Sequence, residues 1–212
     1  MRFFRFRIFP GSIRYTGVQP IAWDVETPNI DGRDRLKFLL GREHPEIGWE
    51  DSNKWSDFGG RPHPMDNLLD NAAREAWEES MGLLGSMEEI REAVKKSGKI
   101  VRIYAAPNVQ TGVVFLMPIP YQPDLPHLFA RVYDYFKRCT VKSERGFDYI
   151  PSCLEGFYEK TEIQWFTARQ LFNAVNGRWN VLQDGPMPSF RPAYLHAFPK
   201  ILEVARTVYP YT

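Results

Sequence analysis

Residues 59–82, GGRPHPMDNLLDNAAREAWEESMG, form the stretch of this chain that decides its fold. The run REAWEE at 74–79 predicts an amphipathic helix over about residues 67–81, ending at Gly82, where a glycine can take the left-handed conformation that closes helices. Glu78 and Glu79 would then lie at the negative end of the helix dipole, where each acidic group costs about 0.3–1 kcal/mol. A helix that needed only solubility would carry Lys or Arg there, so the pattern indicates a bound cation.

Three carboxylates of this helix project from one side. At about 100° per residue, Glu79 lies about 40° from Glu75 around the helix, and Glu78 lies about 60° the other way. Two carboxylates about 4 Å apart repel by about 4 kcal/mol at an effective dielectric of about 20. A divalent ion turns this repulsion into attraction, because hard cations prefer oxygen ligands. Arg74 is expected to pair with Glu78 or with an acid upstream. Taken alone, the run EAWEE is more typical of a solvated acidic face.

The spacing around the acidic run favours the metal interpretation. Five residues separate Gly60 from Asp66, and seven more separate Asp66 from Arg74. This frame resembles the Nudix box, in which a glycine, an acid, Arg-Glu and Glu-Glu occur at fixed distances, and a match of this length is a strong signal. Two features depart from the family pattern. Asp66 replaces a glutamate that in the family typically pairs with the motif arginine, and two residues rather than one separate Glu79 from Gly82.

The resemblance implies an α/β (α+β) fold, a Nudix-type α/β/α sandwich with a mixed sheet and an extra C-terminal helical part. We expect a single domain over residues 1–212, with the box at 60–83 and additional helices at about 125–139 and 191–208. Periodicity alone predicts only mixed α and β structure. It indicates helices at 86–97 and 167–175, a strand over residues 1–9, and strands at 21–25, 36–42, 99–106, 111–119 and 162–166.

The resemblance also implies an activity, that of a divalent-metal-dependent pyrophosphohydrolase. The substrate would be a nucleoside diphosphate linked to another group, such as a nucleotide or a dinucleoside polyphosphate, cleaved by water attack on phosphorus. The cofactor would be Mg²⁺ or Mn²⁺, since such ions bridge phosphate oxygens and lower the pKa of the attacking water.

The expected metal ligands come from the box. Glu78 and Glu79 are expected to bind the ion, and Glu75 is expected to be a ligand or the general base. In the family a backbone carbonyl just before the box glycine joins the metal shell, which points to Gly59. Arg74 is expected to serve catalysis by orienting the acidic cluster through a charge-assisted pair.

A further carboxylate in the family comes from a loop or strand start well after the box. Glu162, expected to be catalytic, and Glu159 are the candidates in the segment EKTEIQWF, and solubility at a strand edge explains both equally well. Arg61, Trp55 and Glu159 are the expected substrate contacts. His63 has no partner pattern of a metal ligand and is expected to be a loop histidine.

The sequence leaves the substrate open. Alternatives to a free nucleotide are the 5′ cap of an mRNA and a diphosphoinositol-type phosphate, and a Nudix-fold binding module is the non-enzymatic alternative. The segments WSDFGG and EESMGLL resemble a subgroup that includes large-virus and phage proteins, and this resemblance and the aromatic content favour the cap. The size of the chain and its nearly neutral charge slightly favour a small molecule. Aromatic residues that either stack on a base or belong to the core are Trp49, Trp55, Tyr104, Tyr158 and Trp165. Basic residues that form either a phosphate-binding rim or a solvated surface are Lys137, Arg138, Lys142 and Arg145.

Composition limits the partners. The net charge of +1 gives no general attraction to nucleic acid or to membranes. The chain has no apolar run of membrane-spanning length, and Cys139 and Cys153 form no disulfide framework or zinc pattern. We therefore expect a cytoplasmic protein, in the host cell if it is viral, without membrane contact. Its partners would be a nucleotide-type small molecule or capped RNA, and a homodimer stays open.

Overall fold

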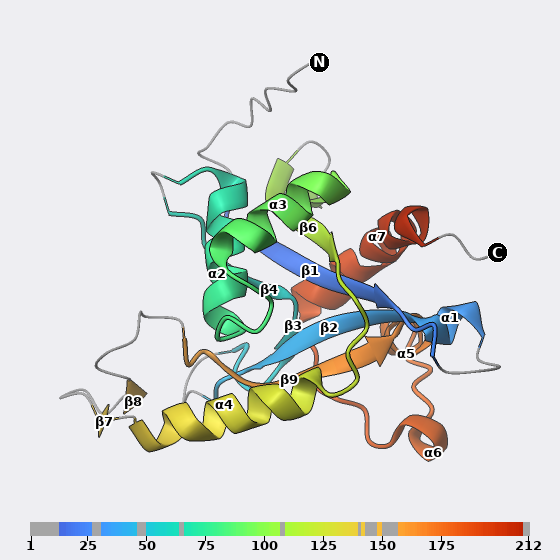
Figure 1. Cartoon of the computed structure of the whole chain (residues 1–212). Coiled ribbons are helices and arrows are strands. Elements are labelled where there is room, and N and C mark those ends of the chain that lie inside the picture. The colour runs from blue at the N-terminus through green and yellow to red at the C-terminus, as the bar shows by residue number, and fades with distance from the viewer. Residues whose placement is uncertain are drawn as a thin grey trace.

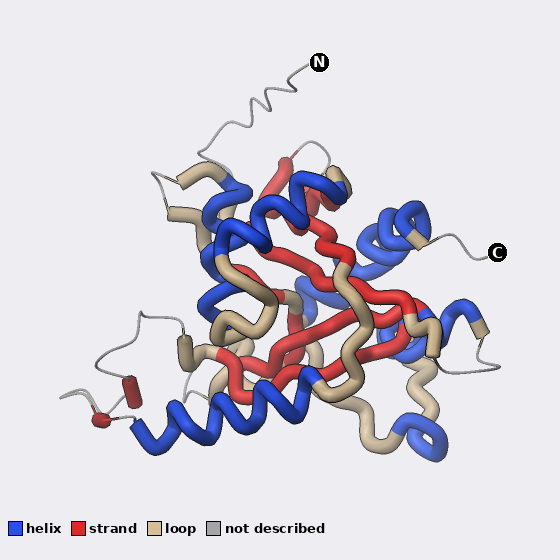
Figure 2. Tube along the Cα trace, viewed as in Figure 1, coloured by secondary structure: helices blue, strands red, loops and turns tan. Residues whose placement is uncertain are grey.

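A mixed seven-stranded sheet with helices around it forms the centre of the computed structural model (Figure 1). The structure describes residues 13–26, 31–45, 50–63, 66–106, 109–139, 141–142, 148–149 and 157–209. Figure 2 shows the strands of this sheet at the centre of the molecule and the helices outside them. The predicted fold class, α/β with a mixed sheet, is confirmed.

One parallel pair makes the sheet mixed. The strands of the sheet are β1 (Tyr15–Trp23), β2 (Leu36–Glu43), β3 (Trp55–Ser56), β4 (Phe58–Gly60), β5 (Ile100–Ala106), β6 (Val109–Pro118) and β9 (Lys160–Thr167). Their order is β3-β2-β1-β6-β5, with β4 beside β1 and β9 beside β2. Strands β1 and β6 run parallel, and the other pairs are antiparallel. The strands β7 (Val141–Lys142) and β8 (Asp148–Tyr149) form a separate antiparallel pair.

Two hydrophobic cores lie on the two faces of this sheet. The helices are α1 (Gly32–Arg35), α2 (Leu68–Glu79), α3 (Met87–Ser97), α4 (Leu125–Cys139), α5 (Ala168–Val175), α6 (Val181–Asp184) and α7 (Pro192–Val208). Helices α5 and α7 build one core, and α2, α3 and α4 build the other. Strand β2 serves both, because Phe38 and Leu40 face the first core and Leu39 faces the second. Burying each of these side chains contributes about 1.5–3 kcal/mol.

The sheet forks where the functional site lies. Strands β1 and β2 pair only near Ile21–Trp23 and Leu36–Phe38; farther along, β4 pairs with β1 and β3 pairs with β2. Gly59 therefore lies within the sheet opposite Gly17, where a Cβ on Gly59 would come within 2.4 Å of the Gly17 Cα. Only glycine fits at this crossing.

Most element boundaries agree with the local sequence signals. The predicted strand at 36–42 and the predicted helices at 86–97, 125–139, 167–175 and 191–208 correspond to β2, α3, α4, α5 and α7. The capping box of Ser86 and Glu89 is present, and Thr167 caps α5. Strand β1 begins at Tyr15, well before the predicted start at 21, because Gly17 and Pro20 interrupt the apolar pattern. The strand predicted over residues 1–9 lies outside the described residues.

The described helices are each too short or too polar to cross a bilayer.

The exit of α2 differs from the prediction. The helix ends at Glu79, and the left-handed residues that follow are Met81, with φ of 52°, and Gly82, with φ of 76°. The Gly82 amide donates to the Trp77 carbonyl at 2.8 Å and the Met81 amide donates to the Glu78 carbonyl at 2.9 Å, which is a Schellman motif. The additional residue before Gly82 thus places a methionine where this motif prefers glycine. The Met81 side chain is 8% exposed and packs in the core of α2, α3 and α4, which offsets the backbone cost.

This conformation predicts an order of stability for two variants that both lose the Met81 side chain. Met81→Gly should be more stable than Met81→Ala by about 1 kcal/mol, because only the alanine retains a Cβ in the left-handed region. Urea unfolding of both variants measures the difference. Equal midpoints, or a more stable alanine variant, would contradict the strained geometry at residue 81.

Candidate metal centre

Helix α2 approaches the sheet closely enough to bring carboxylates to the fork. Asn67 starts the helix by accepting hydrogen bonds from the amides of Leu69 and Asp70 at 3.0 and 2.8 Å. The apolar residues on the buried face of the helix are small, namely Ala72, Ala73 and Ala76. On the strand, a Cβ on Gly60 would lie 2.8 Å from the Glu75 Oε2 atom. The small alanines of the helix let it approach the strand, and the absence of a side chain at Gly60 leaves space for the carboxylate of Glu75.

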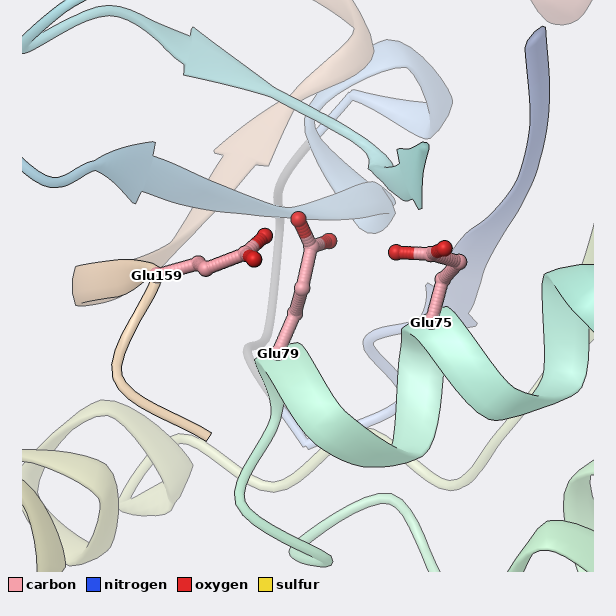
Figure 3. Close-up of side chains that lie close together, drawn as sticks. All are labelled: Glu75, Glu79 and Glu159. Atoms are coloured by element: carbon pink, nitrogen blue, oxygen red, sulfur yellow. The ribbon is translucent and has the colours of Figure 1, made fainter. Parts of the chain in front are cut away.

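Three carboxylates meet at this place. Glu75, Glu79 and Glu159 each offer an oxygen atom, and these atoms lie within 4.8 Å of one another. Figure 3 shows Glu75 and Glu79 projecting from α2, with Glu159 approaching from the segment before β9. Glu75 and Glu79 are buried, whereas Glu159 is exposed. An all-oxygen, acidic donor set fits Mg²⁺ or Mn²⁺.

Both carboxylate oxygens of Glu79 have fixed partners. Its Oε2 atom accepts a hydrogen bond from the Gly59 amide at 2.8 Å, and its Oε1 atom lies 3.2 Å from the Lys160 Nζ atom. These contacts orient Glu79 toward the other two carboxylates. Gly59 is thus brought to the site as predicted from the box, here through its N–H group, and the use of its carbonyl as a ligand stays a prediction.

Arg74 bridges two acids of the box. Its Nη1 atom lies 2.6 Å from the Glu78 Oε2 atom, and its Nη2 atom lies 2.6 Å from the Glu75 Oε1 atom. Of the expected partners, Glu78 or an acid upstream, Arg74 pairs with Glu78. Glu78 itself lies outside the group of three carboxylates, because it lies round the helix from Glu75 toward Arg74. Asp66, the departure from the box pattern, is exposed.

The third carboxylate is Glu159, and Glu162 is placed elsewhere. In the β2–β9 ladder Glu162 pairs with Arg42, but Lys160 pairs with Glu43, so that β9 carries one extra residue there. This β-bulge turns Lys160 to the face of the metal centre and brings Glu159 with it. Glu162 stays exposed and pairs with the Arg42 Nη1 atom at 3.1 Å. The prediction that Glu162 is catalytic is therefore not supported by its position.

Lys160 is the main residue that the sequence reasoning missed. Its side chain is fully buried and pairs with Glu43 and Glu79, while its Nζ atom also lies 3.4 Å from the Ser56 Oγ atom. The Arg191 Nη1 atom lies 3.3 Å from Glu43. The only sequence signal for Lys160 is its place beside Glu159 in the segment EKTE, and solubility at a strand edge explains a lysine there equally well. We call the whole connected group the charge network: it joins Glu43, Asp51, Glu75, Glu78, Glu79 and Glu159 to Lys54, Arg74, Lys160 and Arg191.

Burial shifts the acids of this network toward their protonated forms. The pKa of Glu79 lies well above its ordinary value because of burial, although Lys160 opposes the shift. Burial likewise raises the pKa of Glu78 from 4.5 to about 7, against the effect of Arg74. Partial desolvation and the charge of Glu75 raise the pKa of Glu159. For Lys160, burial lowers the pKa, but Glu79 and Glu43 outweigh it and raise the pKa above its ordinary value, so this side chain is a cation.

The remaining predicted contacts divide into core and surface. Trp55 is 5% exposed and packs edge-on against Phe166 at 5.3 Å between ring centroids, so it is a core residue rather than an open stacking surface. Arg61 and His63 are exposed in the loop after β4. Tyr158 stacks on Tyr133 at 4.8 Å with 3° between the ring planes, directly before Glu159.

The other aromatic and basic candidates lie away from the carboxylates or outside the description. Tyr104 is exposed on β5, the Trp165 Nε1 atom donates to the Gln122 carbonyl, and Lys137 and Arg138 are exposed on α4. For Lys142 only the backbone is described. The residues that lie outside the described part are Trp49, Arg145 and Cys153.

Comparison with known proteins gives structural neighbours only. Neither a protein-family model nor a curated protein matches the sequence. A mutT/nudix family protein from Listeria innocua is similar at 14% identity, covering 93% of this chain and 96% of its own, with a TM-score of 0.47. The Nudix hydrolase RenU from M. smegmatis is similar at 11% identity, covering 93% and 89%, with a TM-score of 0.44. The C. elegans Ap4A hydrolase is similar at 13% identity, covering 90% and 98%, with a TM-score of 0.39.

The raised pKa values predict how stability depends on pH and metal. Because the pKa of Glu78 rises from 4.5 to about 7, and those of Glu79 and Glu159 also rise, the folded protein binds more protons than the unfolded chain between these values. Without divalent ions, the free energy of unfolding should therefore fall as the pH rises from 4.5 to about 7. Saturating Mn²⁺ should replace the protons and remove this fall.

Thermal unfolding across this pH range, in EDTA and in Mn²⁺, measures the effect. A metal-free protein whose unfolding temperature rises steadily with pH up to about 7 would show that these acids are not held protonated by burial.

Proposed function

We propose that this chain is a divalent-metal-dependent hydrolase of the Nudix type that cleaves a pyrophosphate bond in a nucleoside diphosphate linked to another group. The observation that carries the proposal is that Glu75 and Glu79, on a helix with the box spacing, meet Glu159 at the sheet fork. Such an acidic site is costly without a cation and suits a substrate whose phosphates also need cations.

The residues take distinct roles in this proposal. Glu75, Glu79 and the Gly59 carbonyl would hold the metal ion, which when bound would neutralise phosphate oxygens and lower the pKa of the attacking water. Glu78 contributes indirectly, by holding Arg74 against Glu75. In the reaction, the water oxygen forms a bond to one phosphorus, and the bond from that phosphorus to the bridging oxygen breaks. The second phosphate leaves with the bridging oxygen.

Glu159 takes the proton of the attacking water. It is the exposed member of the three carboxylates, so it faces the side from which water and substrate arrive. Its raised pKa makes it a better proton acceptor near neutral pH than an ordinary glutamate. Because Glu159 follows Tyr158 directly, the base also lies beside aromatic rings.

These aromatic rings support a nucleotide as the substrate. Tyr158, directly before Glu159, stacks on the Tyr133 ring of α4, and the His44 ring lies 5.3 Å away between centroids. Nucleobases stack on such rings without requiring a particular base. These rings therefore favour a free nucleotide or an mRNA cap, each of which has a base that can stack. A diphosphoinositol phosphate has no base, so the rings do not favour it.

Three matched variants separate the proposed roles. Glu79→Gln should lose Mn²⁺ affinity and activity together. Glu159→Gln should retain Mn²⁺ binding while kcat falls by about 10²–10⁴-fold, the usual contribution of a general base. Glu162→Gln, an exposed acid on the same strand, should change neither quantity and serves as the control. Isothermal titration with Mn²⁺ and phosphate release supply both readouts, and loss of Mn²⁺ binding in Glu159→Gln would make this residue a ligand instead.

A substrate panel tests the class of the protein. Dinucleoside polyphosphates, nucleoside diphosphate conjugates, capped RNA and a diphosphoinositol phosphate are each incubated with Mg²⁺ or Mn²⁺, and released phosphate or nucleotide is measured. Turnover of a nucleotide-containing member supports the proposal. A folded protein that binds Mn²⁺ and turns over none of them would instead be a binding module.

A further inference from the structure

Lys160 occupies a position that is built for a cation. Its ammonium group is surrounded by oxygen atoms of Glu43, Glu79 and Ser56, which come from β2, α2 and β3. The side chain is fully buried. Three oxygen donors, two of them carboxylates, are the kind of ligand set that a divalent ion uses in proteins.

The backbone around Lys160 is adapted to this side chain. A Cβ on Gly41 would lie 2.9 Å from the Lys160 Cδ atom, so a residue larger than glycine would collide with its stem. The bulge in β9 turns Lys160 toward Glu43 instead of along the alternation that Glu162 follows. Glycine and bulge together fix the ammonium beside Glu79.

Outside the metal centre, Glu79 also lies near a second carboxylate, that of Glu43, because both acids contact the Lys160 ammonium. A second ion held by Glu79 and Glu43 would have to lie where the Lys160 ammonium lies.

We propose that Lys160 takes the place of a second metal ion, so that the protein itself holds a single divalent ion, with Glu79 shared between that ion and the lysine. This inference rests on the proposed metal centre. Lys160 is a positioning residue here, because it acts on the ion through Glu79 and does not touch the substrate. Additional ions in the reaction would have to arrive with the phosphates of the substrate.

The number of Mn²⁺ ions bound without substrate tests this inference. Isothermal titration, together with the electron paramagnetic resonance signal of free Mn²⁺, should give one ion for the wild type. Lys160→Ala should bind a second ion at Glu43 and Glu79, and the double variant Lys160→Ala/Glu43→Gln should return to one. Lys54→Ala, which removes a lysine from the same network at Asp51, should still bind one ion and controls for net charge.

The outcomes are distinguishable. A wild type without bound Mn²⁺ would refute the proposed metal centre. A wild type with two or more ions, or Lys160→Ala with one, would overturn the role of Lys160 and leave the proposed hydrolase intact. If Lys160→Ala unfolds in EDTA, Mn²⁺ should restore its folding cooperatively with two ions bound; failure of saturating Mn²⁺ to do so would also count against the inference.

Discussion

Close contact between α2 and the forked sheet is the constraint on which the site depends. A helix can deliver carboxylates to a strand at this range only if the strand has no side chains there. Gly59 meets Gly17 across the ladder, and Gly60 leaves space for the Glu75 carboxylate. The helix contributes small residues on the same side, so that its acids, rather than bulky apolar groups, reach the sheet. The glycines of the box are therefore steric requirements as well as motif positions.

Such an arrangement buries like charges, and the fold compensates most of them with fixed cations. Arg74 forms ion pairs with Glu75 and Glu78 on one side of α2, and Lys160 forms an ion pair with Glu79 on the other. Removing one member of a buried pair costs about 3–5 kcal/mol, because the remaining charge loses its partner. The network therefore ties α2, β2, β9 and the start of α7 together, since Arg191 extends it from Glu43. These cations do not cancel the effect of burial, which still raises the pKa values of Glu78, Glu79 and Glu159.

The sequence predicted those features that are set by residues close together in the chain. The helix positions of Glu75 and Glu79 and the pairing of Arg74 follow from residues within a few turns of each other. Glu159 and Glu162 could not be ranked from sequence, because the bulge that separates them forms only when β9 pairs with β2. Lys160 was missed for the same reason: its partners come from three elements that are distant in the chain.

The exit of α2 shows why the departure from the box pattern leaves the carboxylates in place. The extra residue enters after Glu79, where the chain has already left the helix, and the left-handed turn still pairs the carbonyls of Trp77 and Glu78. The last helical turn therefore keeps its hydrogen bonds, and Glu79 keeps its direction toward the sheet. In this altered turn the Met81 side chain packs into the core beside α3. An insertion before Glu79 would instead have rotated the acid by about 100° and removed it from the site.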